Sequence, residues 1–397
     1  MKVKTYILPI IVIAQFFCTS LWFAGNSVIN DLILHFNLPQ NALAHLTSAV
    51  QFGFVIGTLI FALLTISDRF SPSKIFMVCA LLGAMFNLGT ILPFNNLTTL
   101  LLLRFLTGFL LAGIYPVGMK IAADYYDKGL GKSLGFLLGA LVMGIAFPHF
   151  IKGFTNGLDW KLVSFITSGV AVLGGLSIFL FVPNGPFRTQ SQKIHFSAFL
   201  KIFENSKFKA AAFGYFGHMW ELYTFWAFLP SIILLYVQNH PENNLNVSIT
   251  SFIIIACGSV ACMLIGFLSL KLNIKKLAIV TLAASCVCCL VSPFFINSSS
   301  LIFFLIFLGF WAMMVIADSP MFATLVAQNA PLTQKGTALT IVNSIGFAIT
   351  IVSLQFINWM KNLVNPQLIY LFLAIGPILG LIALLMKNNN YEATKEN

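Results

Sequence analysis

His218, Glu221 and Tyr215 place polar groups inside one long apolar stretch, residues 209–236. His218 and Glu221 are three residues apart, so an α-helix would put both on one face, which Tyr215 shares. An ionised carboxylate without a partner does not persist in a hydrocarbon environment. Because burial disfavours the charged form of both groups, such a pair can hold or pass one proton. We predict a substrate or proton-coupling site here, with a structural buried hydrogen bond as the alternative.

Two further charged residues fall inside apolar stretches. Arg104 lies in the first part of the stretch 98–120, deep enough for its insertion into a bilayer to be costly. We expect its guanidinium to face a cavity, where it would attract an anionic substrate or a coupled carboxylate; snorkelling to the interface is the alternative. Asp318 shortly precedes Pro320, and a proline frees a backbone carbonyl, which is tolerated where a helix lines a cavity. We place Asp318 in the same site, with exposure at the cytoplasmic edge as the alternative.

The first apolar stretch carries a polar stripe. Gln15, Trp22 and Asn26 follow the spacing of one helical face, and we add them to the candidate substrate or coupling residues. Trp22 packing against a neighbouring helix is the alternative. No His-x-x-x-His metal pair occurs, nor does the full Gly-x4-Gly-Lys-Ser/Thr pattern that binds nucleotides. The seven cysteines fit the role of small packing residues. We therefore expect no enzymatic activity, no metal and no cofactor.

These residues must be positioned by membrane-spanning helices. Of the 397 residues, 59% are hydrophobic and only 8% are charged, whereas a soluble domain is about 25% charged. A spanning helix needs about 20 apolar residues, and the apolar runs are too long and lack the alternation expected of a β-barrel. The expected fold is an all-α membrane protein with twelve spans, at residues 6–29, 45–66, 75–94, 98–120, 130–152, 161–182, 209–236, 249–270, 277–296, 300–325, 334–358 and 366–386.

The basic residues predict the orientation. With both termini on one side, 18 of the 22 Lys and Arg residues fall on that side and only Lys152, Lys161 and Lys361 on the other, while Arg104 lies within a helix. Cytoplasmic loops carry the excess of Lys and Arg, so both termini are predicted to be cytoplasmic. This topology also accounts for the net charge of +11 without nucleic-acid binding. We expect a monomer in the inner membrane of a bacterial cell, whose partners are the lipid bilayer, a small-molecule substrate and protons.

The longest polar stretch divides the chain into halves. We expect a six-helix bundle at residues 1–183, a cytoplasmic linker at 184–207, a second six-helix bundle at 208–387 and a cytoplasmic tail at 388–397. The halves echo each other, since Ala-Gly-Ile-Tyr-Pro at 112–116 resembles Ala-Asp-Ser-Pro at 317–320. Parallel six-helix repeats are a recurrent plan of membrane transporters.

Residues 66–74, Ile-Ser-Asp-Arg-Phe-Ser-Pro-Ser-Lys, carry a resemblance to a known family. Asp68, Arg69 and Lys74 resemble the signature loop of the major facilitator superfamily, although two glycines and one basic residue of the pattern are replaced. In that family the charges of this loop latch helix ends on the cytoplasmic side and release them during alternating access. The resemblance therefore implies a gating role for these three residues; a solvated charge pair is the alternative.

Further segments extend the resemblance. Arg104 stands where the fourth helix of the family carries an arginine, although Thr107 departs from the usual glutamine. In helix five the antiport signature is incomplete, because Pro148 is displaced by one place. The runs 19–26 and 218–223 resemble a poorly characterised bacterial branch of the superfamily, in which some relatives are labelled nitrate/nitrite- or cyanate-type permeases.

The resemblance implies secondary active transport by alternating access, with a central cavity between the two halves. We expect proton-coupled uptake of a small polar or anionic solute. Two alternatives stay open at this stage. One is proton-antiport efflux of a drug, metabolite or siderophore, which the incomplete helix-five signature argues against. The other is a sensor or scaffold that does not transport, which the several costly buried charges argue against.

Overall fold

The computed structural model describes residues 4–126, 130–155, 158–188, 202–331 and 335–386, without the side chains of residues 68, 130–132, 335 and 337. Every regular element within these ranges is a helix. The first half holds α1 (Ile7–Thr19), α2 (Ala24–Ser27), α3 (Ile29–Phe36), α4 (Ala42–Leu63), α5 (Ile66–Arg69), α6 (Pro72–Gly89), α7 (Leu97–Leu111), α8 (Tyr115–Tyr125), α9 (Leu130–Phe154) and α10 (Lys161–Phe181). The second half holds α12 (Ser206–Asn239), α13 (Val247–Leu268), α14 (Ile274–Ile296), α15 (Leu301–Ala317), α16 (Ser319–Asn329), α17 (Lys335–Met360), η2 (Ile369–Ala374) and α18 (Ile375–Leu385).

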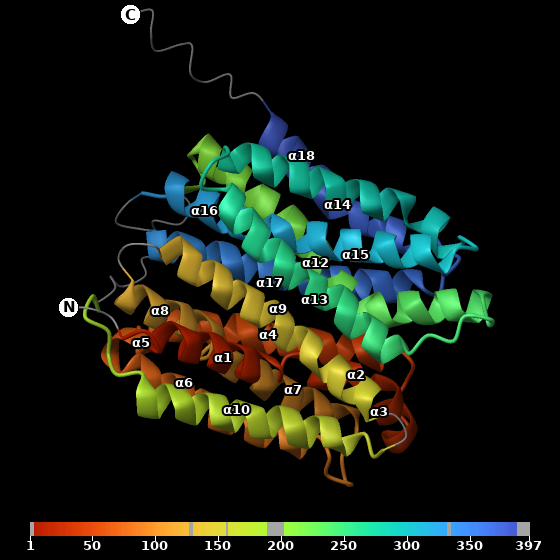
Figure 1. Ribbon diagram of the computed structural model, residues 1–397, viewed down its shortest axis with the longest axis horizontal. Coiled ribbons are helices and arrows are strands. Elements are labelled where there is room, and N and C mark those ends of the chain that lie inside the picture. Colours follow the sequence, from red (N-terminus) through yellow and green to blue (C-terminus); the bar gives the residue numbers. More distant parts are fainter. Residues whose placement is uncertain (1–3, 127–129, 156–157, 189–201, 332–334, 387–397) are drawn as a thin grey trace, which may run out of the picture.

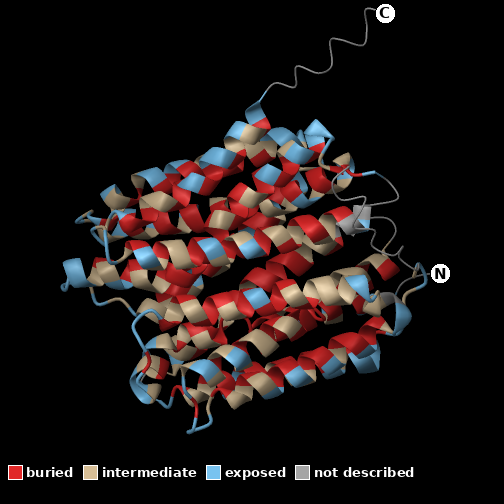
Figure 2. Cartoon of the chain, turned by 180° about the vertical axis from the view of Figure 1, so that it is seen from behind, coloured by how far each residue is buried: buried red, intermediate tan, exposed pale blue. Residues whose placement is uncertain are grey.

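Within the described ranges, ten helical segments are long and apolar enough to cross a membrane, and two shorter apolar segments lie at Ile7–Thr19 and Ile369–Leu385. Helices are the expected form, because lipid cannot satisfy backbone N–H and C=O groups and a helix pairs them internally. Large apolar side chains such as Ile302, Phe303 and Ile306 are exposed on the outside of the bundle, while the buried residues line its interior (Figure 2). The predicted all-helical, multi-pass class is confirmed; the count of twelve spans stays a prediction.

Three of the predicted spans are interrupted. The first is broken into α1, α2 and α3. The fourth is broken between α7 and α8, and the tenth at Asp318 between α15 and α16. Both α8 and α16 begin with a proline in their first turn. The N–H groups in the first turn of a helix have no partner within that helix, so a proline there costs no hydrogen bond. Proline is therefore favoured where a new helix begins.

The two halves of the chain form the two sides of one bundle (Figure 1). Within a half, small residues let helices approach closely. A Cβ added at Gly108 of α7 would lie 2.0 Å from the carbonyl oxygen of Val50 in α4, so only glycine fits at this contact. Between the halves, α9 packs along α13 and α4 packs along α17. The Ser259 hydroxyl of α13 donates to the carbonyl of Gly139 in α9 at 3.1 Å.

Several contacts between the halves lie at one end of the bundle. We call the end where α1 begins and α18 ends the terminal end, and the opposite end the distal end (Figure 1). At the distal end, a Cβ on Gly153 of α9 would lie 2.5 Å from Ile249 of α13, and Gln355 of α17 donates to the Ser48 hydroxyl of α4 at 2.8 Å. At the terminal end of α9, a Cβ on Gly135 would meet no described atom within 4 Å. The described contacts between α9 and α13 thus extend from Gly153 at the distal end to Gly139.

Candidate functional site

Glu221 is held by three donors in the interior of the second half. Its carboxylate is 1% exposed, and its Oε1 accepts hydrogen bonds from Ser285 Oγ at 2.5 Å, Trp311 Nε1 at 2.6 Å and Cys289 Sγ at 3.2 Å. Ser285 and Cys289 lie one turn apart on α14, and Trp311 lies on α15. Hydrogen bonds to the charged form favour ionisation, whereas burial favours the protonated acid. The carboxylate of Glu221 is thus tied to both α14 and α15.

His218 pairs with Asp318. Its Nδ1 lies 2.7 Å from Asp318 Oδ1, and both side chains are 1% exposed. Asp318 stands at the break between α15 and α16, where its own carbonyl accepts from the amide of Phe322 at 2.9 Å. His218 Nε2 is buried and has no hydrogen-bond partner. His218 and Glu221 lie on the same helix as predicted, and their joint role in coupling stays a prediction. Each residue has a partner on another helix, and the described structure has no hydrogen bond between them.

The structure brings Tyr215 to this group as predicted. Its ring centroid lies 5.8 Å from that of His218. On the other side, a Cβ on Gly346 of α17 would lie 2.5 Å from the Tyr215 ring, so the glycine makes room for the tyrosine. Tyr215 therefore lies between the His218–Asp318 pair and the helix α17, which packs against the first half.

Arg104 holds the break in the first span. It is 1% exposed; its Nη1 donates to the carbonyl of Leu21 at 3.0 Å and its Nη2 donates to the carbonyl of Trp22. These carbonyls lie in the break between α1 and α2, so the guanidinium supplies the donors that the broken helix lacks. This burial contradicts the snorkelling alternative. The described structure shows no carboxylate paired with Arg104, and the expectation that it attracts an anionic group stays a prediction.

Trp22 lies in an aromatic cluster that joins the halves. Its ring centroid is 4.8 Å from that of Phe54 in α4, 5.6 Å from that of Tyr223 in α12 and 5.7 Å from that of Phe347 in α17. The last two contacts are stacked, with interplanar angles of 30° and 25°. Since α4 belongs to the first half and α12 and α17 to the second, the Trp22 ring lies at the interface between them.

Polar atoms without partners surround this cluster. They are buried and comprise Trp22 Nε1, both amide atoms of Gln51, Trp226 Nε1 and Ser344 Oγ. Gln51 lies one turn from Phe54, Ser344 one turn from Phe347, and the Trp226 ring contacts that of Tyr223 at 5.2 Å. More than nine in ten buried polar groups in proteins have partners. These side chains are therefore candidates for contact with a polar molecule, and this role stays a prediction.

The other two predicted residues of the first span differ in their surroundings. Both amide atoms of Gln15 are buried without a partner, and a Cβ on Gly118 of α8 would lie 2.3 Å from Gln15 Oε1. Asn26 instead donates to the Thr47 hydroxyl of α4 at 2.8 Å. Gln15 thus has an unpaired buried amide, whereas Asn26 ties α2 to α4, and the predicted role of both residues stays a prediction.

The predicted gating loop lies at the terminal end, apart from these groups. Arg69 and Lys74 are exposed, and the side chain of Asp68 lies outside the described residues. The backbone of this loop is held by the segment after α10, because Arg188 Nη2 donates to the carbonyl of Phe70 at 2.9 Å. The role of the loop in gating stays a prediction.

Sequence reasoning missed several residues of the site. Ser285 and Cys289 are spaced as one helical face within the run 277–296, a signal that could have been noticed beside a buried acid. Trp311 lies in a nearly unbroken apolar run, and nothing in the sequence distinguishes it from a tryptophan that only packs. Gln51 falls in the span 45–66 and could have been recognised as a rare amide within a membrane helix.

Comparison with known proteins agrees with this architecture. Two crystal structures of a bacterial homologue of the human lysosomal transporter Spinster superpose over 96% of this chain. The inward-facing unoccupied form has a TM-score of 0.70, 15% identity and 94% of its own chain covered. The inward-facing occupied form has a TM-score of 0.69, 17% identity and 96% coverage. At such identities the likeness shows the fold alone.

A sequence relative is "Putative metabolite transport protein YyaJ" of Bacillus subtilis (strain 168), which is 25% identical over 185 residues. The match covers 46% of this chain and 39% of that relative, so the chain spans about two fifths of the length of the curated relative. The model of the Major Facilitator Superfamily matches residues 11–354, most of the chain. A chain with this match and this helical fold, which buries Glu221 and Asp318 within the bundle, belongs to the Major Facilitator Superfamily of membrane transporters.

Proposed function

We propose that the protein is a secondary active transporter that takes up a small polar or anionic solute together with protons. The observation that carries this proposal is the placement of two buried acids, Glu221 and Asp318, beside an interface between the halves that is lined with unpartnered polar atoms. A non-transporting scaffold would gain nothing from either feature, since buried acids and unpaired buried polar groups both cost stability.

Protons are proposed to bind at Glu221 and at the His218–Asp318 pair. With the interior dry, the three donors to Glu221 Oε1 and the burial of the carboxylate act against each other. Water that enters from one side favours the ionised acid, so the group can take its proton on one side and release it on the other. Coupling then requires that proton and solute occupancy affect each other, a linkage that is reciprocal for binding.

The solute is proposed to bind between the halves. Trp22 and Gln51 of the first half and Trp226 and Ser344 of the second supply indole N–H, amide and hydroxyl groups without partners. Arg104 has no paired carboxylate among the described residues, and its charge close to Trp22 favours a solute with anionic groups. The excess of hydrogen-bond donors over acceptors and the buried positive charge support the proposed polar or anionic solute.

The two halves are proposed to alternate between states open to either side, as six-helix repeats of one fold. The positive-inside rule puts the terminal end in the cytoplasm. The distal contacts at Gly153 and Gln355 support the proposal that this state is closed to the outside. Uptake is completed from such a state when solute and proton leave toward the cytoplasm.

Transport by right-side-out vesicles from expressing and from empty cells tests the proposal. The vesicles are given a mixed metabolite pool and a pH gradient, acidic outside. We expect one or a few polar or anionic metabolites to accumulate only in vesicles that contain the protein, and a protonophore to abolish this accumulation. Solutes depleted from preloaded vesicles under the same gradient would instead indicate efflux. No difference between the two kinds of vesicle under either gradient would contradict transport.

A further inference from the structure

Lys361 lies directly after α17 at the distal end. The other charged residues described at that end form ion pairs. Lys152 lies 2.8 Å from Asp31 and Lys161 lies 3.9 Å from Asp159, while Glu242 is paired with His240 at 3.4 Å. No carboxylate of the described residues is paired with Lys361. Its ammonium lies over the ring of Phe228 in α12, 4.3 Å from the ring centroid. A cation over an aromatic face is stabilised but keeps its capacity to bind an anion.

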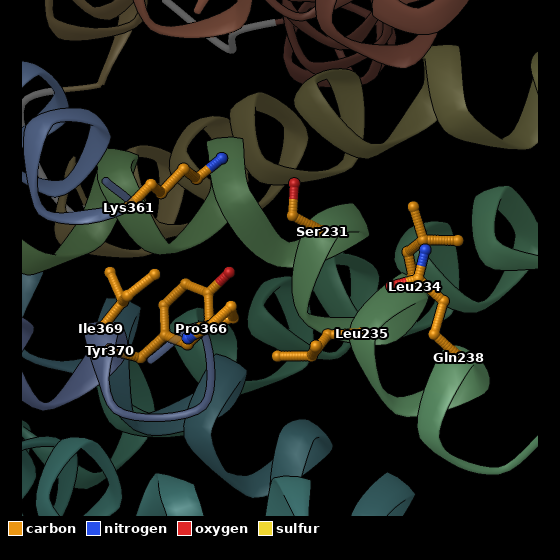
Figure 3. A pocket seen from close by; sticks show the side chains of 8 residues that line it. All are labelled: Ser231, Leu234, Leu235, Gln238, Lys361, Pro366, Ile369 and Tyr370. Atoms are coloured by element: carbon orange, nitrogen blue, oxygen red, sulfur yellow. The ribbon is translucent and has the colours of Figure 1, made fainter. Parts of the chain in front are cut away.

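This ammonium lines a hollow between α12 and the segment that joins α17 to α18 (Figure 3). The hollow has a volume of about 240 Å³ and is lined by Ser231, Leu234, Leu235, Gln238, Lys361, Pro366, Ile369 and Tyr370. Lys361, Ser231 and Tyr370 turn their polar ends toward the same space (Figure 3). Together with the Gln238 amide they offer several donors, and the lining contains no carboxylate.

We propose that this hollow is a binding site for an oxyanion, a phosphate or carboxylate group, carried on an apolar body. The ammonium, hydroxyl and amide groups would bind the anionic oxygens, and the wall formed by Leu234, Leu235, Pro366 and Ile369 would contact the apolar part. The volume is below the range of about 300–1,000 Å³ typical of pockets for drug-sized ligands, so it fits one such group and not a large molecule. The headgroup of an anionic lipid and a free amphiphilic anion share this chemistry.

The pKa of Lys361 is consistent with a site that binds an anion. Burial lowers the pKa of Lys361 to about 8, because the ammonium loses hydration and no carboxylate compensates for the loss. The other titratable group in the lining is Tyr370. An anion bound beside the ammonium raises its pKa again and also covers the amine.

Amine labelling tests the site without depending on transport. The full chain in nanodiscs is treated at pH 8 with an acetylating reagent, and the rates at Lys361 and Lys161 are read by peptide mass spectrometry. In phosphatidylcholine alone we expect fast labelling of Lys361. An anion that raises its pKa by one unit lowers the neutral fraction, and with it the rate, by about fivefold. Lys161, ion-paired and on the same end, controls for surface pH and ionic strength.

The source of the anion is distinguished by the additive. Protection of Lys361 relative to Lys161 by phosphatidylglycerol in the nanodisc identifies a lipid headgroup. Protection by inorganic phosphate or hexanoate in phosphatidylcholine, against chloride of equal ionic strength, identifies a soluble anion. Ser231→Ala should weaken either protection while leaving the Lys361 rate without additive unchanged. The proposal is overturned if neither additive slows Lys361, or if Lys361 is not labelled in phosphatidylcholine while Lys161 is.

Discussion

Replacing Glu221 by glutamine should separate the proposed proton coupling from solute binding. The amide has nearly the size of the carboxylate and keeps an oxygen that can accept from Ser285, Cys289 and Trp311. Alanine would be a poor test, because it leaves three buried donors without an acceptor at about 1–3 kcal/mol each. That loss approaches the whole stability of a folded domain, about 5–15 kcal/mol. Glu221→Gln should therefore fold and bind solute, while it can no longer take up or release a proton.

The expected size of the effect follows from the driving force. One proton moving down a gradient of one pH unit supplies about 1.4 kcal/mol, which supports about tenfold accumulation of a solute. The native protein in proteoliposomes should approach this ratio if one proton accompanies each solute. Glu221→Gln should reach a ratio of about one, because the gradient no longer acts on it, and it should still exchange labelled for unlabelled solute in preloaded vesicles.

The assay has a matched control, and one outcome would refute the role of Glu221. Glu242→Gln makes the same chemical change at a carboxylate that is exposed at the distal end and paired with His240. It should accumulate solute as the native protein does. If Glu221→Gln concentrates solute under the imposed gradient, the proton travels through another group, and Asp318 is the next residue to replace.

Three further predictions address the topology, the gate and the break in the first span. Tags placed at residue 1, within residues 189–201 and at residue 397 should all be inaccessible from outside intact cells; labelling of any one from outside contradicts the twelve-span topology. Asp68→Asn should lower the maximal rate of transport several-fold with little change in solute affinity, and a normal rate at normal expression would exclude a gating role. Arg104→Met should remove the donors to the carbonyls of Leu21 and Trp22. At about 1.5–3 kcal/mol for a hydrogen bond from a charged group, it should lower both the thermal unfolding temperature and solute binding, while Lys152→Met changes binding little.

Composition and run length predicted the class of fold, because lipid as a solvent imposes long apolar helices on any sequence that crosses it. They did not predict where a helix breaks. The run 6–29 looks continuous in the sequence, and its break depends on Arg104, a residue in another helix that stabilises the freed carbonyls. The interruption at Asp318 was indicated by Pro320, since proline acts locally on its own helix.

The candidate residues could be identified from the sequence, because polar and ionisable side chains are energetically costly in a membrane. Their partners could not be identified in this way. Spacing within one helix shows only which residues share a face. His218 and Glu221 share one, yet the helices packed against that face supply closer partners, Asp318 to the first and Ser285 to the second. These partners are 100 and 64 residues away in the sequence, so only the packing of α12 against α14, α15 and α16 could show them.

The same helix α12 carries both kinds of group that a coupled transporter must link. His218 and Glu221 contact partners inside the second half. Tyr223 and Trp226, two and five residues after Glu221, belong to the aromatic cluster around Trp22. A helix is stiff over so short a distance, because each turn is tied to the next by backbone hydrogen bonds. Movement of α12 when solute binds between the halves would therefore change the distances from Glu221 to Ser285 and Trp311. A loss of even one of these donors would alter the balance between burial and hydrogen bonding at the acid, and the proposed coupling of solute to proton would then need no residues beyond those of α12 and its partners.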